Sequence, residues 1–151
     1  MAKYVIAREG ATPVAGNMML GLTTGLQEIA KVTEIRIGGE AASSTKNRMA
    51  VRRSTSNLTT PTAQTPAKKS STSPAAYTDA STTATGEPTT AAAPAIWTES
   101  LDAHGNTIHW IAPEEADALL VQGATAGNNE ITLESSSGTG VVSIEIVFEE
   151  V

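Results

Sequence analysis

The stretch Val142-Ser143-Ile144-Glu145-Ile146-Val147-Phe148 carries the clearest β-strand pattern in this chain of 151 residues. Large apolar residues occupy every second position, namely Val142, Ile144, Ile146 and Phe148. The alternate positions hold Ser143, Glu145 and Glu149. Because successive side chains of a strand point to opposite faces, we expect the four apolar residues to line a core. Their burial would contribute roughly 6–12 kcal/mol before entropy is counted.

Weaker patterns of the same kind precede this strand. Residues 130–134 alternate, with Ile131 and Leu133 on the expected core face. Residues 107–111 and 117–121 are two further candidate strands, and we expect Trp110 to lie in the core. Turn-forming residues separate these segments. Short strands with regular turn signals predict an all-β protein, an antiparallel β-sandwich that is jelly-roll-like.

The first half of the chain adds two candidate strands, at residues 32–37 and 48–52. Residues 13–30 contain three glycines, which weaken a helix, although a turn or two is compatible with residues 26–30. We therefore expect residues 1–30 to form an N-terminal arm with short helical pieces. Residues 31–151 then form a single β-sandwich domain.

Residues 54–93 differ in composition from the rest of the chain. Ser, Thr, Ala and Pro dominate this segment, and only Leu58 and Tyr77 are large and apolar. Ordering a backbone costs roughly 1–2 kcal/mol per residue, which the burial of two large side chains does not offset. We expect a long, extended Ser/Thr/Ala/Pro-rich segment that becomes ordered only when it is held in an assembly.

Composition limits the classes of protein that are expected. The chain has no cysteine, so it has no disulfide framework and no thiolate metal site. No apolar run approaches the roughly 18 residues of a membrane helix, so we expect no membrane segment. Glu9 and Gly10 stand where the apolar region of a signal peptide would be, and no such peptide is expected. A net charge of -6 disfavours direct nucleic-acid binding.

Charge is distributed unevenly along the chain. All ten basic residues lie within the first 69 positions, against four acidic residues, and the other twelve acidic residues lie in the remainder. Such polarity favours contact between copies or docking onto a charged scaffold. Alternatively, the two halves are neighbours in one fold and neutralise each other. The densest basic cluster comprises Arg48, Arg52 and Arg53, a candidate docking patch for carboxylates of a neighbouring subunit.

Catalytic constellations are weak. Asp102, His104 and His109 could together hold a metal, but a turn of the form Asp-x-His-Gly-Asn needs no metal to explain it. No Gly-x-Ser-x-Gly elbow accompanies the many serines. Glu114, Glu115 and Asp117 are better explained as a solvated acidic loop than as a pair of catalytic carboxylates. We therefore expect a protein that is not an enzyme and uses no cofactor or metal.

Three stretches together resemble small structural proteins of tailed bacteriophages. They are Ile35-Arg36-Ile37-Gly38-Gly39-Glu40, then residues 59–66, and lastly residues 108–113 with the ending at 137–143. The resemblance implies a virion protein such as a capsid decoration, or cement, protein with a β-sandwich body. It transfers no catalytic residue.

These observations lead to two hypotheses for function. The first is a non-enzymatic virion protein on the capsid surface, whose partners are the major capsid protein and neighbouring copies of itself, so that it forms a homo-oligomer within the assembly. Multivalent contact on a lattice would then strengthen weak individual contacts. The alternative is a carbohydrate- or receptor-binding β-sandwich module of a fibre or adhesin. That alternative requires an exposed aromatic platform, for which Trp97 and Trp110 are the candidates.

Overall fold

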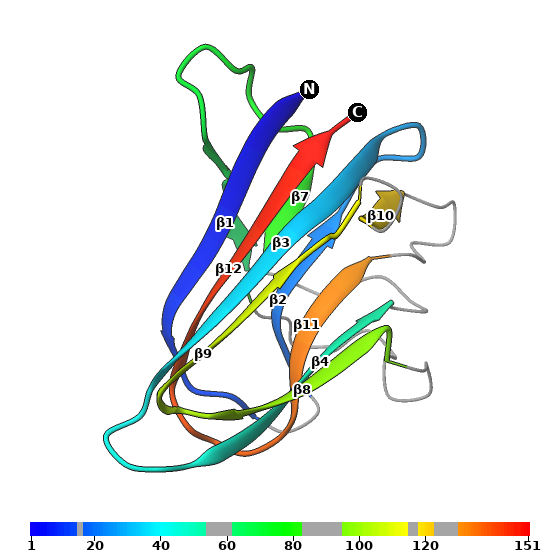
Figure 1. The fold of residues 1–151 in the computed structure, drawn as a ribbon. Coiled ribbons are helices and arrows are strands. Elements are labelled where there is room, and N and C mark those ends of the chain that lie inside the picture. The colour runs from blue at the N-terminus through cyan, green and yellow to red at the C-terminus, as the bar shows by residue number, and fades with distance from the viewer. Residues whose placement is uncertain (15–16, 54–61, 83–94, 115–117, 123–129) are drawn as a thin grey trace.

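The protein is a β-sandwich of two antiparallel six-stranded sheets (Figure 1). The computed structural model describes residues 1–14, 17–53, 62–82, 95–114, 118–122 and 130–151, and these contain no helix. Accordingly, no helix in these ranges is long and apolar enough to span a membrane. The expected all-β sandwich is confirmed.

The first sheet, sheet A, contains the three longest strands among the described residues, β3 (Ile29–Glu40), β12 (Val142–Glu150) and β1 (Ala2–Ala11), side by side. Its order is β10 (Leu119–Gln122), β3, β12, β1 and β6 (Ala67–Lys68). A sixth strand, β9 (His104–Ile111), pairs with β3 on residues 34–40, next to the part of β3 that pairs with β10.

The second sheet, sheet B, has a simple linear order. It runs β5 (Ala63–Gln64), β7 (Asp79–Ser81), β2 (Met18–Thr23), β11 (Ile131–Ser137), β4 (Lys46–Arg53) and β8 (Trp97–Asp102). Strand β8 continues into β9 through Ala103 alone, so the chain passes from sheet B to sheet A at that corner.

The strand pairing is nested, which is the signature of a jelly roll. Among the described residues, eight strands have six residues or more, and the first pairs with the last, β1 with β12. Moving inward along the chain, β2 pairs with β11, β3 with β9 and β4 with β8. The successive pairs alternate between sheet A and sheet B. The nested strand pairs thus form one long antiparallel hairpin, which is folded so that its pairs alternate between two facing sheets.

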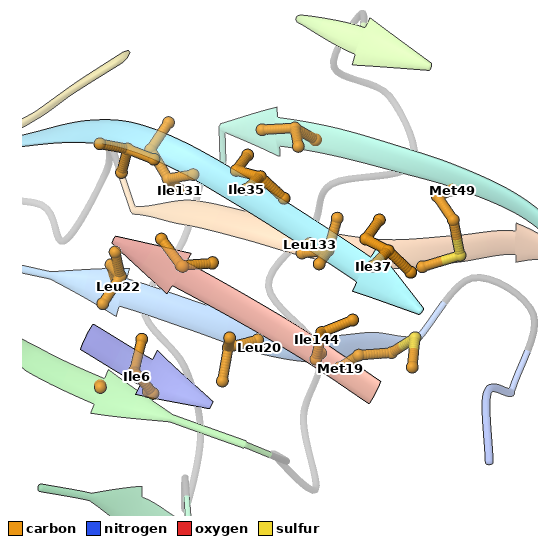
Figure 2. Packing of buried hydrophobic residues seen from close by; sticks show 14 of the residues in the cluster. Ile6, Met19, Leu20, Leu22, Ile35, Ile37, Met49, Ile131, Leu133 and Ile144 are labelled. Atoms are coloured by element: carbon orange, nitrogen blue, oxygen red, sulfur yellow. The ribbon is translucent and has the colours of Figure 1, made fainter. Parts of the chain in front are cut away.

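The core lies between the sheets and is almost entirely aliphatic (Figure 2). All six aliphatic and phenylalanine residues predicted to lie in the core are at most 2% exposed: Ile131, Leu133, Val142, Ile144, Ile146 and Phe148. Trp110 is only partly buried, although it packs against this cluster. Its strand, β9, is an edge strand of sheet A, so one side of the indole lacks a neighbouring strand.

The expectation of an N-terminal arm with helical pieces is wrong. Strand β1 lies between β12 and β6 in sheet A, and β2 lies between β7 and β11 in sheet B. Tyr4 and Ile6 alternate into the core from β1, as a strand requires. In β2, residues 18–22 are a short apolar run buried on both faces. Gly21 disfavours a helix but is tolerated in a strand that packs closely.

The central part of the Ser/Thr/Ala/Pro-rich segment is held by the domain itself. Strands β5 and β7 pair at one edge of sheet B, and β6 pairs with β1 in sheet A. The backbone N–H groups of Tyr77 and Thr78 both donate to Oε1 of Glu150, each at 2.8 Å, and the Tyr77 hydroxyl donates to the Ile29 carbonyl at 2.7 Å.

For residues 62–82, the expectation of order only within an assembly is therefore wrong. Hydrogen bonds to the domain's own strands stabilise this stretch in place of apolar burial, a contribution that residue composition does not reveal. Residues 54–61 and 83–93, with Leu58, lie outside the described residues.

Asn47 fastens the turn between β11 and β12 to β4. Its amide donates to the Gly140 carbonyl at 2.7 Å and accepts from the Gly140 N–H at 3.0 Å, and the side chain is buried. Asn47→Ala leaves both backbone groups without this partner, so we expect a loss of roughly 2 kcal/mol in unfolding free energy. Urea denaturation measures it, with exposed Asn106→Ala as the control; equal stability of the two variants would contradict the assignment.

Candidate functional site

The three arginines predicted as a docking patch do not form one exposed surface. Arg48 is exposed and shares the outer face of β4 with Arg52, as the alternation predicted. Arg52, however, donates to the Glu134 carboxylate at 2.5 Å, and its side chain is only 18% exposed. Arg53 is partly buried and, in register with Ile131, lies on the opposite face of β4; burial lowers the pKa of its guanidinium. Arg48 alone remains available.

Ion pairs join the basic and acidic halves of the chain inside both sheets. Lys3 lies opposite Glu149 on neighbouring strands at 2.7 Å, and the Glu149 carboxylate raises the pKa of Lys3. Arg36 lies opposite Glu145 at 3.4 Å. Together with Arg52–Glu134, these pairs show that the nested pairing brings the first strands against the last. Part of the charge polarity is therefore neutralised within one molecule, because the basic and acidic halves of the chain are neighbours in the fold.

The two histidines lie at different places on β9 and make different contacts. His104 Nδ1 lies 2.9 Å from the Ala41 carbonyl. His109 Nε2 lies 3.3 Å from a Glu34 carboxylate oxygen and 3.2 Å from Arg36 Nε. Burial would raise the pKa of Glu34, but hydrogen bonds from His109 and Arg36 outweigh burial and lower it. Within the described ranges, no group of three His, Asp or Glu residues could hold a metal ion.

Asp102 has a local structural role at the corner between β8 and β9. Its carboxylate accepts hydrogen bonds from Ser44 Oγ at 2.6 Å, from the Thr45 N–H at 3.1 Å and from the His104 N–H at 3.0 Å. These bonds, that of Ser44 foremost, lower the pKa of Asp102. The Asp-x-His-Gly-Asn motif therefore caps a turn.

The outer face of sheet A contains an open hollow of about 620 Å³ that is lined by polar and apolar atoms. Gly38 lies in its floor, and a Cβ added there would meet no atom within 4 Å. Side chains of both charges surround this position, from four different strands: Glu9, Arg36, Glu40, His109 and Glu145. Ser143 donates to Glu40 on one wall. The hollow forms because Gly38 of β3 has no side chain, and the residues opposite it, Thr107 on β9 and Ser143 on β12, have small ones.

The same face carries exposed apolar side chains toward the end where both termini lie (Figure 1). Ile111, opposite Glu34 in the register, is 54% exposed, and Leu120, opposite Lys31, is 46% exposed. A second hollow of about 330 Å³ lies there between Met1, Ile111 and Ala118. The outer face of sheet A thus offers both charged groups and exposed apolar contact area.

Sheet B presents a different outer face. Ala50, Thr132 and Glu134 lie on that face by register, yet none of them is more than 3% exposed. The two tryptophans offer no exposed platform either, because Trp97 and Trp110 are partly buried and pack against the core. Sheet A therefore presents the more accessible of the two faces.

No protein-family model, curated protein or solved structure matches this chain. A function for this protein is therefore inferred from its fold and from the chemistry of its surface.

The outer face of sheet A could not be predicted from the sequence, because its residues are far apart along the chain. Its residues come from β1, β3, β9 and β12, and Arg36 and His109 are separated by 73 positions. Gly38 could have been a signal, since a glycine in a strand marks a close approach or an open space.

Proposed function

We propose that this protein is a non-enzymatic structural component of a bacteriophage virion that binds and stabilises the capsid through the outer face of sheet A. The observation that carries the proposal is the contrast between the faces: sheet A is open and chemically mixed, and the centre of sheet B is buried. Exposed apolar residues rimmed by polar ones are typical of protein–protein contact sites.

The jelly-roll topology agrees with the proposal as an analogy. Viral capsid proteins often use this architecture, but lectins and cupins use it too, so the fold does not select a function by itself. The resemblance of residues 35–40, 59–66, 108–113 and 137–143 to phage structural proteins points in the same direction. Neighbouring copies and the major capsid protein are then the partners, and repetition on the shell raises avidity.

Gly38→Arg is expected to abolish docking without disturbing the fold. The new side chain enters the open hollow, where nothing lies within 4 Å of its Cβ, and Gly38 has no left-handed backbone that would penalise it. Co-sedimentation with preformed capsid shells measures binding, and thermal unfolding checks the fold. Thr98→Arg, an exposed position on β8 of sheet B, is the matched control. Equal binding by both variants would rule out sheet A as the docking face.

The hollow also supports a second candidate function, a carbohydrate-binding module of a fibre or adhesin. Its volume is adequate for part of a sugar ligand, and its carboxylates, arginine and histidine can accept and donate hydrogen bonds. A glycan-array screen tests this alternative. Binding that is lost in both Gly38→Arg and Glu145→Ala would favour it over capsid docking.

A further inference from the structure

We propose that two copies of this protein associate through the free edge of β9, which pairs antiparallel with β9 of the second copy to join two A sheets into one. The inference goes beyond the proposed function and does not depend on it, because the contact forms between two copies in solution.

The first argument is that β9 has unused backbone hydrogen-bonding groups. One edge of β9 pairs with β3, and no strand among the described residues pairs with its other edge. In an antiparallel ladder, alternate residues bond to a given neighbour. Since the Ala112 N–H donates to the Thr33 carbonyl at 3.0 Å, the register assigns residues 108 and 110 to β3. Thr107, His109 and Ile111 therefore direct their N–H and C=O groups to the free edge.

The second argument is that β9 lacks the features that protect edge strands over residues 107–111, where its pairing with β3 is free of the register shift near Gly38 and Glu40. Proteins commonly guard an edge with charged residues, proline or a very short strand. β9 has eight residues, none of them Lys, Arg, Asp, Glu or Pro. The six-residue edge strand β8 carries Glu99 and Asp102, and the other edge strands β5, β6 and β10 have four residues or fewer. Residues 107–111 of β9 are thus the longest unguarded edge segment among the described residues.

The third argument is that β9 is complementary to itself. The regular part of its pairing with β3 spans residues 107–111, and His109 is at the centre. A two-fold axis at His109 places Thr107 of each copy opposite Ile111 of the other, and Ile108 opposite Trp110. Ile108 and Trp110 are partly buried against the core, so the second copy extends the core over their uncovered sides. The absence of full charges from both strands avoids like-charge repulsion, which favours a second copy as the occupant.

His109→Pro tests the contact selectively. Its N–H points to the free edge, so proline removes an edge donor while the bonds from residues 108 and 110 to β3 remain. Analytical ultracentrifugation is expected to show a concentration-dependent dimer for the wild-type chain and only a monomer for the variant, with matching circular dichroism. A wild-type chain that stays monomeric at its highest soluble concentration would overturn the proposal, as would an unchanged dimer in folded His109→Pro.

The absence of cysteine from the chain allows a second test that does not depend on the proline variant. Cα atoms of directly opposed residues lie about 5.5 Å apart, within the range for a disulfide. His109→Cys should therefore form a disulfide-linked dimer on mild oxidation.

Two matched variants control this cross-link. Thr107→Cys lies on the same edge, but the two copies of residue 107 are offset by about 13 Å along the strands in this register. Thr98→Cys lies on the edge strand of the other sheet. Neither control should cross-link. Cross-linking of all three variants to the same extent would show random collision and contradict the register.

Discussion

Phe148→Ala is expected to destabilise the protein by roughly 3–5 kcal/mol. Phe148 is fully buried, and its ring stacks on that of Tyr4 with centroids 5.5 Å apart. It lies on β12 between Tyr4 of β1 and Val32 of β3, so truncation opens a cavity at the centre of sheet A. The measurement is urea denaturation, in which the midpoint should fall while the slope stays constant.

Two control variants separate cavity formation from any loss of apolar surface. Phe148→Leu retains much of the volume and should cost clearly less than Phe148→Ala. Ile111→Ala removes an apolar side chain that is 54% exposed and should have little effect. If Phe148→Ala and Ile111→Ala proved equally stable, β12 would not pack as the central strand.

Arg52→Ala is expected to cost about 3–5 kcal/mol because it removes the guanidinium that pairs with a buried carboxylate. The Glu134 side chain is only 4% exposed and lies on the central strand of sheet B, opposite Met18 on one side and Ala50 on the other. The variant leaves the buried Glu134 carboxylate without this guanidinium, so the desolvation penalty of that carboxylate is less fully offset. Thermal and urea unfolding of the variant measure the loss.

The double variant Arg52→Met/Glu134→Leu provides the contrasting case. Replacing both charges with apolar side chains of similar size is often neutral or stabilising for buried pairs. We expect the double variant to be more stable than Arg52→Ala by several kcal/mol. If Arg52→Met and Glu134→Leu destabilised the protein additively, the two side chains would not be energetically coupled. Arg48→Ala, at the exposed end of β4, should change stability little in either background.

Local sequence patterns predicted the strands that have a clean alternation. β12, β11 and the regular part of β9 each repeat apolar residues with a period of two, which depends only on neighbouring positions. β1 and β2 lie in the stretch predicted as an N-terminal arm, where the three glycines of residues 13–30 weaken a helix and no clean alternation marks a strand. Tyr4 and Ile6 do alternate into the core, but Val5 between them is also apolar, so the period of two is not distinct in the sequence.

Contacts between distant segments could not be predicted in the same way. Glu150 anchors Tyr77 across 73 positions, and Arg52 reaches Glu134 across 82. Both depend on the nested order of strands, which no local pattern specifies. The sequence identified a basic cluster at residues 48–53, but only the register reveals that Arg52 and Arg53 are already engaged or partly buried. The open face over Gly38 and the free edge of β9 likewise depend on the order and register of the strands, which local sequence patterns do not reveal.

The most direct test of the capsid role is titration of the purified chain onto preformed shells of the major capsid protein encoded in the same genome. The proposed function predicts saturable binding with a fixed number of copies per shell, and a higher temperature of shell disassembly at saturation. Shells that bind no chain above background, and disassemble at the same temperature with and without it, would contradict the proposed function.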